Sequence, residues 1–422
     1  MTEKALLVDL GASRSKSIVV DNKTLVIDSM HTTAGSAISG DTIPMHSFTS
    51  TLEAHLAEAF KKYGVISKII LATEMHGYVS CNSHSPELSP YNSWRVSHPS
   101  DKYVIKLLSA STFQNSTGLR PRSGLPIVHI LATHMHQESV PAREILFLPQ
   151  AICRLMGKDN GNVHLSLAQS SGLYELNGNP AEIDKVKDLA LPLASKDDAI
   201  ELGEIQYGSH SIPVYGGYGD LQTSVYGVSP KTEQWIINLG TGSQVAIRSN
   251  SNLSGFEKRP YFNKEMLQAV THLPAGRALN VFASLFAEIR GEKSHDHFWR
   301  ELEAIKEFKE APMSSIDMNV FQQARHFETG GKIEGILEEQ FSMHQLLLSL
   351  VYGIVKNYTD VIKQSGIKSN LPILLSGRMG EKIALFPAVI ERMNENKVMI
   401  QHDEIDSSLL GLRRVYIENI LK

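Results

Sequence analysis

Two segments that lie far apart in the chain follow one pattern, and this internal repeat is the feature that most constrains the fold. Residues 7–13 read LVDLGAS and residues 236–242 read IINLGTG. Each segment has an apolar strand, an Asp or Asn, a Leu, a Gly and two small residues, and a second strand with β-branched residues follows. Self-similarity of this kind indicates a duplicated unit. We therefore expect two α/β domains, each opened by a hairpin with a small-residue tip.

Both hairpin tips can offer backbone N–H groups to an anion, because Gly permits close approach and successive N–H groups in a turn bind phosphate. A short sequence match can arise by chance, so the shared chemistry of the two tips is the stronger evidence. It predicts that the two tips together bind one polyphosphate. Only the first copy has an acid, Asp9, where the second has Asn238. One carboxylate suits one Mg²⁺, which it would hold directly or through water. An Asx turn is the structural alternative for Asp9.

Size and charge exclude several classes of protein. The chain has 422 residues, enough for two domains, and its formal net charge of −4 lacks the basic field of a nucleic-acid binder. Cys81 and Cys153 have no metal-ligand spacing and predict reduced thiols. Residues 346–355, the most apolar segment, span about half of a membrane, and the N-terminus has no secretory pattern. We expect a cytoplasmic protein without nucleic-acid or membrane partners.

Strand and helix patterns alternate along both ends of the sequence. A capping box at residues 50–53 predicts a helix start, and Gly64 suits the end of that helix. Residues 94–160 are predicted to be mostly helical, and the charged residues 178–210 to form a peripheral surface connection. We further expect strands at residues 6–9, 17–21, 66–72, 212–215, 235–239, 245–248 and 371–375, and helices at residues 343–362 and from about 407.

Six short motifs lie in a fixed order between residue 6 and about residue 415. They are residues 9–16 (DLGASRSK), 75–77 (MHG), 219–220 (GD), 238–243 (NLGTGS), 376–380 (SGRMG) and 408–411 (SLLG). Together they resemble the FGGY-type carbohydrate kinases, which use such motifs as first phosphate loop, sugar site, catalytic base, second phosphate loop, adenosine site and pocket-closing helix. Within that family, residues 219–226 (GDLQTSVY) are most similar to the sedoheptulokinases.

Several departures from the family pattern concern the sugar more than the reaction. Ala12 replaces a Thr of the first loop, and Glu74 replaces the Gln before Met-His-Gly. The family's Trp-x-Asp-x-Arg corresponds to residues 94–98 (WRVSH), which lack the Asp and the Arg. Its Gly-Gly-Asn survives only loosely at residues 275–277 (AGR), and Leu221 stands where many pentulose kinases have a polar residue.

The resemblance implies a role for each candidate residue. Asp220 would be the catalytic base and contact the substrate, and Met75, His76 and Trp94 would contact the sugar. Asp9 would hold Mg²⁺. The candidate ATP-binding residues share small side chains or positive charge: Gly11, Ser13, Arg14, Lys16, Gly240, Thr241, Gly242, Gly276, Gly377 and Gly380.

Structural alternatives exist for these residues. Asp220 could cap the helix that follows it, and Met75 with His76 could be no more than a strand end. Lys16 could be a solvated side chain, and the glycines could belong to plain turns. The resemblance favours the functional interpretation, except that for Trp94 a core position is as well supported as a sugar contact.

The fold implied by the resemblance has two ribonuclease-H-like domains of the actin/hexokinase type on either side of an ATP cleft. We expect an N-terminal sugar-binding domain at residues 1–226 and a C-terminal nucleotide-binding domain at residues 227–422. The predicted reaction transfers the γ-phosphoryl group of ATP to a hydroxyl of a ketose. Sedoheptulose is the first candidate, a pentulose such as xylulose or ribulose the second, and a polyol the third. The sequence leaves open whether the protein is a monomer or a homodimer.

Two other functions stay open. A degenerate family member would bind nucleotide or sugar without turnover; the missing Asp and Arg after Trp94 favour this, whereas Asp9 and Asp220 speak against it. An actin-like or chaperone-like ATPase would have no sugar motif, which Met75 and His76 provide here.

Overall fold

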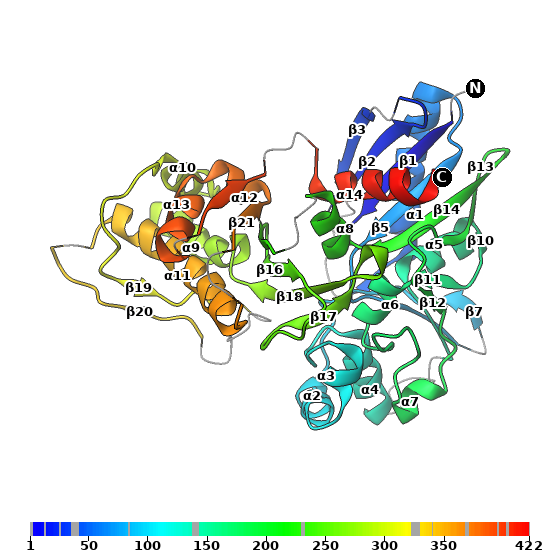
Figure 1. Cartoon of the computed structure of the whole chain (residues 1–422), viewed down its shortest axis with the longest axis horizontal. Coiled ribbons are helices and arrows are strands. Elements are labelled where there is room, and N and C mark those ends of the chain that lie inside the picture. Colours follow the sequence, from blue (N-terminus) through cyan, green and yellow to red (C-terminus); the bar gives the residue numbers. More distant parts are fainter. Residues whose placement is uncertain are drawn as a thin grey trace. The chain divides into compact units, whose positions relative to one another are not determined.

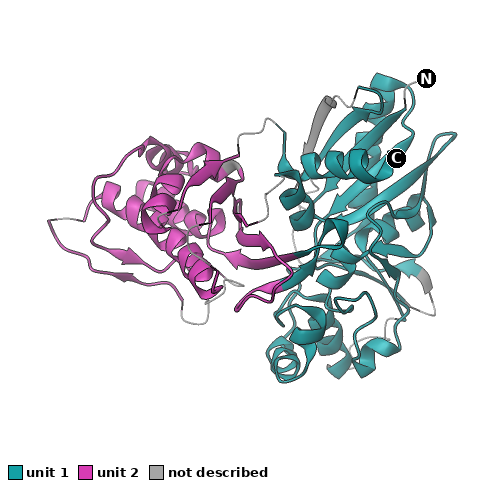
Figure 2. Cartoon of the chain, in the orientation of Figure 1, with its two compact units in different colours: residues 1–229, 258–266, 405–422 teal, residues 230–257, 267–404 magenta. Residues whose placement is uncertain are grey.

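The chain divides into two compact units, drawn in teal and magenta in Figure 2. Unit 1 comprises residues 1–229, 258–266 and 405–422, and unit 2 comprises residues 230–257 and 267–404. The sequence predicts a single boundary, after residue 226, and does not indicate the two later segments that return to unit 1. The computed structural model describes residues 3–11, 14–24, 27–34, 42–82, 85–136, 143–228, 233–321, 330–339, 341–367, 371–394, 396–401 and 405–421.

A mixed sheet of seven strands forms the centre of unit 1, in the order β10-β13-β14-β5-β1-β2-β3 (Figure 1). β1 (Lys4–Leu10) pairs antiparallel with β2 (Arg14–Asp21), which pairs antiparallel with β3 (Ile27–Ala34). On its other side β1 runs parallel to β5 (Lys68–Thr73), and β5 runs parallel to β14 (His210–Gly219). The apolar residues of β1 and β5 are fully buried, as expected for strands covered on both faces.

Helix α1 (Met45–Tyr63) precedes β5 and shows one error in the sequence prediction. It begins after Pro44 and not at the capping box, because its buried face continues back to Met45 at helical spacing. The predicted end is confirmed: Gly64 has a positive φ of 77° and its N–H reaches the carbonyl of Phe60.

Residues 178–210 are not the surface connection that their charge predicts. They include β12 (Leu193–Ser195) and β13 (Glu201–Tyr207), and β13 pairs with both β10 (Gly157–Asp159) and β14 in the main sheet. Leu202 and Ile205 of β13 are fully buried. The prediction is wrong here because the buried positions alternate with charged ones in a short strand.

The mostly helical character predicted for residues 94–160 is confirmed by α2 (Asp101–Ser109), α3 (Phe113–Thr117), α4 (Pro126–His136) and α5 (Leu148–Met156).

The remaining elements of unit 1 are α6 (Leu165–Ser170), α7 (Asp184–Lys187), α8 (Asp220–Gly227), α14 (Ser407–Val415), β4 (Thr42–Ile43), β6 (Val79–Asn82), β7 (Ser85–Leu88), β8 (Tyr91–Asn92), β9 (Glu144–Leu146), β11 (Asn162–His164), a 3₁₀ turn (Phe262–Lys264) and a π-helical turn (Tyr416–Ile420).

Unit 2 is built on a second mixed sheet. β15 (Trp235–Leu239) pairs antiparallel with β16 (Ser243–Arg248), and β16 with β18 (Met266–Leu273). β15 also runs parallel to β21 (Ile373–Ser376), which runs parallel to β22 (Val398–Ile400). The other elements are α9 (Gly276–Arg290), α10 (Asp296–Ala304), α11 (Met343–Gln364), α12 (Arg378–Lys382), α13 (Leu385–Asn394), β19 (Ser315–Ile316) and β20 (Ile333–Glu334). β17 (Glu257–Pro260) crosses the boundary, because its residues 258–260 belong to unit 1.

The two sheets confirm the predicted duplication. The order β3-β2-β1-β5-β14 in unit 1 matches β18-β16-β15-β21-β22 in unit 2, with the same sequence of antiparallel and parallel pairs. Register agrees as well: Asp9 lies opposite Lys16, and Asn238 lies opposite Gln244. Each unit has its own apolar core. The fold is thus α/β with two ribonuclease-H-like domains. No helix in the described part of the chain is long and apolar enough to span a membrane.

Candidate active site

Three neighbouring parallel strands of unit 1 end at one edge of the sheet, and predicted site residues lie near the end of β1 and just after the ends of β5 and β14. The register places Leu10 of β1 beside Thr73 of β5, and Thr73 beside Gly219 of β14. Ligands of α/β proteins bind at the carboxyl ends of such strands. The fold therefore brings Asp9, one residue before the end of β1, to the same edge as Asp220, the first residue of α8.

Asp220 has the environment of a general base. Its Oδ1 accepts a hydrogen bond of 2.8 Å from the N–H of Leu221, and the N-cap position of α8 belongs to Gly219. Burial, and next the negative charge of Asp9, raise the pKa of Asp220 from 3.8 to about 7; the guanidinium of Arg259 acts in the opposite direction. A carboxyl group whose pKa is close to neutrality is well suited to receive a proton from an alcohol.

A network of charged and polar groups surrounds Asp9. Its Oδ2 lies 2.5 Å from the hydroxyl of Ser408, which also lies 2.7 Å from Oδ1 of Asp406, and Asp406 forms an ion pair with Lys16. Burial raises the pKa of Asp9, although Lys16 and Ser408 act against it. Burial would also raise the pKa of Asp406, but the ammonium of Lys16 and the hydrogen bonds from Lys16 and Ser408 lower it. Lys16, predicted to bind phosphate, thus has a carboxylate partner on the loop before α14.

His76 is held by the protein on both ring nitrogens. Nδ1 donates to the carbonyl oxygen of Ser170 at 2.5 Å, and Nε2 accepts from Nη2 of Arg122 at 3.2 Å. This pattern fixes a neutral imidazole with its proton on Nδ1. The backbone of His76 has a positive φ of 63°, which is uncommon outside Gly and often marks functional sites.

Arg122 is a site residue that the sequence did not reveal. It lies between α3 and α4, outside the six motifs, and no spacing relates it to His76. The family pattern would place an arginine at position 98, where His98 stands. Arg122 brings a guanidinium to the predicted sugar motif from another segment.

Met75 is buried and packs against the residue before the base. A Cβ on Gly219 would lie 2.6 Å from the sulfur of Met75, so a larger residue there would displace the Met75 side chain. The Nη1 atom of Arg259 lies 3.7 Å from the same sulfur, and Arg259 is fully buried. Arg259 belongs to the segment that returns to unit 1, which is why its place beside Met75 could not be predicted.

Trp94 is half-buried, and the guanidinium of Arg95 lies 4.5 Å from the centroid of its ring. This cation–π contact occupies one face of the indole. The sequence left a core position and a sugar contact open, and the half-buried ring is compatible with either.

The predicted nucleotide residues of unit 2 come together around the β15–β16 hairpin. The N–H of Gly276 donates to the carbonyl of Gly240 at 3.2 Å, and the N–H of Arg277 donates to the carbonyl of Thr241 at 2.7 Å. Gly377 has a positive φ of 91°, and a Cβ there would lie 2.4 Å from the carbonyl oxygen of Leu239. The hairpin tip at Thr241 is exposed. Glycines from three segments thus surround one tip.

The structure gives less support to the remaining candidate ATP-binding residues. Gly380 is buried against the side chain of Leu375, which makes it a packing residue. Gly11 follows β1, whereas Ser13 and the side chain of Arg14 lie outside the described residues.

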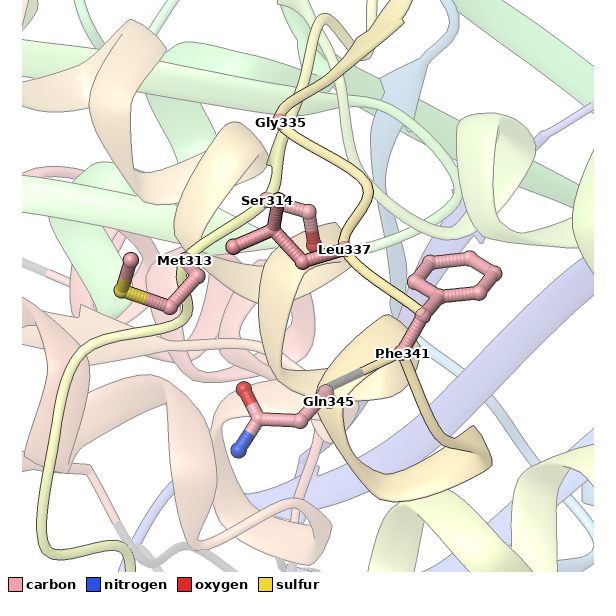
Figure 3. Close-up of a pocket in the computed structure, with 6 residues that line it drawn as sticks. All are labelled: Met313, Ser314, Gly335, Leu337, Phe341 and Gln345. Carbon is pink, nitrogen blue, oxygen red and sulfur yellow. The ribbon is translucent and has the colours of Figure 1, made fainter. Parts of the chain in front are cut away.

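A small pocket of unit 2, shown in Figure 3, contains none of the candidates and is lined by Met313, Ser314, Gly335, Leu337, Phe341 and Gln345.

Comparisons with known proteins agree with this fold. No protein-family model matches the sequence, and no curated protein is significantly similar to it. Among solved structures, a xylulose kinase from Rhodospirillum rubrum matches with a TM-score of 0.81 at 15% identity, over 98% of this chain and 89% of that one. A gluconate kinase from Lactobacillus acidophilus matches with a TM-score of 0.80 at 14% identity, over 99% and 89%. The Plasmodium falciparum glycerol kinase with ADP matches with a TM-score of 0.79 at 14% identity, over 98% and 89%.

Proposed function

We propose that this protein is an ATP-dependent kinase that phosphorylates a hydroxyl group of a small carbohydrate, with Asp220 as the catalytic base. One observation carries the proposal: a half-buried carboxyl group with a pKa of about 7 lies at the carboxyl edge of the unit 1 sheet, close enough to Asp9 for their charges to interact. The fold in which this occurs is shared with xylulose, gluconate and glycerol kinases.

Each group at this edge has a task in phosphoryl transfer. Asp220 would accept the proton of the attacking hydroxyl, which increases the nucleophilicity of the oxygen. The carboxylates of Asp9 and Asp220 offer the oxygen ligands that Mg²⁺ prefers, so Asp9 is the residue we expect to hold the ion. Mg²⁺ would neutralise charge on the phosphates. In unit 2, the hairpin tip at residues 240–242, with Gly276 and Gly377 beside it, would bind the nucleotide.

The acceptor we favour is a ketose. Similarity of residues 219–226 to the sedoheptulokinases supports sedoheptulose, whereas the xylulose kinases among the structural neighbours support a pentulose equally well. His76, Arg122 and Met75 would form the acceptor site. Because both nitrogens of His76 already bind protein groups, we assign the direct polar contact with the sugar to the guanidinium of Arg122.

The test is ADP release from Mg-ATP across a panel of ketoses, aldoses, aldonates and polyols, with a control that contains no acceptor. We expect strong stimulation by one ketose. Asp220→Asn should abolish this stimulation and leave ATP binding near normal, whereas Asp184→Asn, a change on the exposed surface of α7, should have no effect. Full acceptor-dependent activity of Asp220→Asn would remove Asp220 from the role of base.

A second function, binding of nucleotide or sugar without turnover, is favoured by one observation. Val96 and His98 stand where the family has its Asp and Arg, and the guanidinium of Arg95 covers one face of the Trp94 indole. Flat ADP release across the whole panel, together with measurable ATP binding in calorimetry, would establish this alternative in place of the kinase.

A further inference from the structure

A buried hydrogen-bond relay reaches the peptide that precedes Asp220. The N–H of Gly219 donates to Oγ of Ser166 at 3.2 Å, and this Oγ lies 2.7 Å from Nδ1 of His164. Nε2 of His164 lies 3.2 Å from Oδ1 of Asp198. Ser166, His164 and Asp198 are 1%, 2% and 7% exposed, so no substrate can reach the serine hydroxyl in the manner of a hydrolase. We refer to these three side chains as the relay.

The direction of every hydrogen bond in the relay is fixed. Nδ1 of His164 also accepts from the N–H of Ser166 at 3.3 Å, so Nδ1 carries no proton and the serine hydroxyl must donate to it. The imidazole proton is therefore on Nε2 and points to the carboxylate of Asp198. Ser166 has its single proton committed to His164, which leaves its lone pairs to accept from Gly219.

The far end of the relay is tied to both segments that return to unit 1. Oδ2 of Asp198 accepts from the N–H of Asn263 at 2.7 Å and from Nδ2 of Asn419 at 3.3 Å. The imidazole of His164 has aromatic neighbours, with ring centroids 4.9 Å from Tyr218 and 5.8 Å from Phe262. Asp198 therefore joins three separate parts of the sequence.

Gly219 is held on its carbonyl side as well. Oγ1 of Thr223 donates to the carbonyl oxygen of Gly219 at 2.8 Å, so both polar groups of this glycine contact side chains. Gly219 has the least restricted backbone of any residue type, and it directly precedes the base. Without these contacts the peptide between β14 and α8 would have more freedom to rotate, and the carboxylate of Asp220 would move with it.

We propose that Ser166, His164 and Asp198 are positioning residues that fix the place of the Asp220 carboxylate through Gly219. This inference rests on the kinase function proposed above. None of the three touches the reacting atoms. Their role is to keep the base where it can take the proton of the acceptor, because a misplacement of about 1 Å can lower a rate about 100-fold.

Ser166→Ala tests the proposal, with Ser171→Ala as the matched control. Ser171 is equally buried at 1% and its hydroxyl bonds only to local backbone, to the carbonyl of Ala168 at 2.6 Å and from the N–H of Leu173 at 3.0 Å. We expect Ser166→Ala to lower kcat with the best acceptor about 10- to 100-fold and to leave the KM for ATP unchanged. Ser171→Ala should keep kcat within about two-fold. Equal kcat values for the two variants, both corrected for the folded fraction, would overturn the proposal.

A second variant separates positioning from loss of structure. His164→Asn keeps an acceptor for the N–H of Ser166 at the start of α6 but is too short to reach Asp198. It should lower kcat as Ser166→Ala does, and the double variant should be no worse than either single one, since both break one relay. Losses that multiply would indicate two independent defects and would contradict the relay.

Amide hydrogen exchange gives a readout that does not depend on activity. In Ser166→Ala the peptide containing residues 219–222 should exchange about 10-fold faster than in the wild type, with Ser171→Ala unchanged there. Unchanged exchange in Ser166→Ala would overturn the relay. Absence of acceptor-dependent ADP release from the wild type would instead overturn the proposed function, and the exchange data would still decide whether the relay holds this peptide.

Discussion

At the scale of the residue, an ionised Asp220 destabilises the fold. Its pKa is about 7 in the folded protein against an ordinary 3.8, so the folded state holds the proton more tightly than the unfolded state. The favourable contribution of the protonated form is complete below pH 3.8 and is lost as the pH rises to 7. This difference in pKa between the two states corresponds to about 4 kcal/mol at most.

Asp220→Asn should therefore stabilise the protein in a pH-dependent way. The amide keeps an oxygen for the N–H of Leu221 and has no charge to bury. We expect the free energy of unfolding to exceed that of the wild type by up to about 4 kcal/mol at about pH 8 and to differ little at about pH 4. Urea unfolding at the two pH values measures this. An equal effect at both pH values would show that the charge is not the cause.

The same pKa predicts the pH dependence of catalysis. A base must be deprotonated to act, so kcat/KM for the acceptor should rise about ten-fold per pH unit below about pH 7 and level off above it. Initial rates at saturating Mg-ATP between about pH 5 and about pH 9 give the profile. A midpoint near the ordinary aspartate value would contradict the environment described for Asp220.

Arg122 should affect the acceptor and not the nucleotide. Arg122→Gln removes the guanidinium that donates to Nε2 of His76 and to which we assign the polar contact with the acceptor. A hydrogen bond to a charged group is worth about 1.5 to 3 kcal/mol. We expect the KM for the acceptor to rise about 10- to 100-fold, with the KM for ATP unchanged. Lys102→Gln, on the exposed face of α2, is the control and should leave both values as they are. A rise in the KM for ATP alone would place Arg122 elsewhere in the mechanism.

At the scale of the element, α8 and α14 pack through glycines on both helices, and Figure 1 shows α14 in red beside α8. A Cβ on Gly411 would lie 1.9 Å from the carbonyl oxygen of Thr223, and a Cβ on Gly227 would lie 1.9 Å from that of Ser407. This close crossing places Ser408 against Asp9. The resemblance implies that residues 408–411 belong to a helix that closes the nucleotide pocket, and this role stays a prediction. The structure shows that Gly411 lies in the contact between α14 and α8.

Gly411→Ala should separate the two helices, because the clash is with backbone that cannot rotate away. We expect a loss of about 1 to 3 kcal/mol in unfolding free energy, since overpacking of a tight contact has this effect. Leu410→Ala, on the half-buried side of α14, is the comparison: it makes no such clash and should leave the distance between the helices unchanged. Chemical denaturation measures the unfolding free energy of both variants. Equal stability of Gly411→Ala and the wild type would contradict the close crossing of α8 and α14.

Elements with a continuous apolar pattern could be predicted from the sequence. β15 has the predicted bounds, and α11 differs from its prediction by two residues at its end, because buried residues recur at helical spacing along it. β13 was missed because its charged residues conceal a strand with one buried face. Its burial depends on pairing with β10 and β14, which no local pattern encodes.

The residues of the candidate site also divide into those that a local pattern predicts and those that only the fold reveals. The prediction included Asp9, Asp220 and the glycines of the tips, because their chemistry lies within short motifs. It did not include Arg122, Arg259 and Asp406, whose partners are distant in the sequence. A single side chain outside a motif has no signal until the fold brings it to its partner.

At the scale of the whole molecule, unit 1 is discontinuous in sequence. Residues 405–422 return to it after unit 2 is complete, and they contribute the buried side chains of Leu409, Leu412 and Val415. The same segment provides Ser408 for Asp9 and Asn419 for Asp198. We therefore expect the folding of unit 1 to depend on residues 405–422, whereas unit 2 lies entirely before them.

This arrangement predicts an unequal effect of truncation. A chain ending at residue 404 would lack α14 and expose the face of α8 that Gly411 covers. Loss of three fully buried apolar side chains removes about 5 kcal/mol or more of burial, comparable with the whole stability of a domain. We expect calorimetry of the truncated protein to lose the transition of unit 1 and to keep that of unit 2, with limited proteolysis cutting within residues 1–229. Retention of both transitions would mean that the C-terminal segment is dispensable for unit 1. In that case its contacts with Asp9 and Asp198 would serve the site and not the fold.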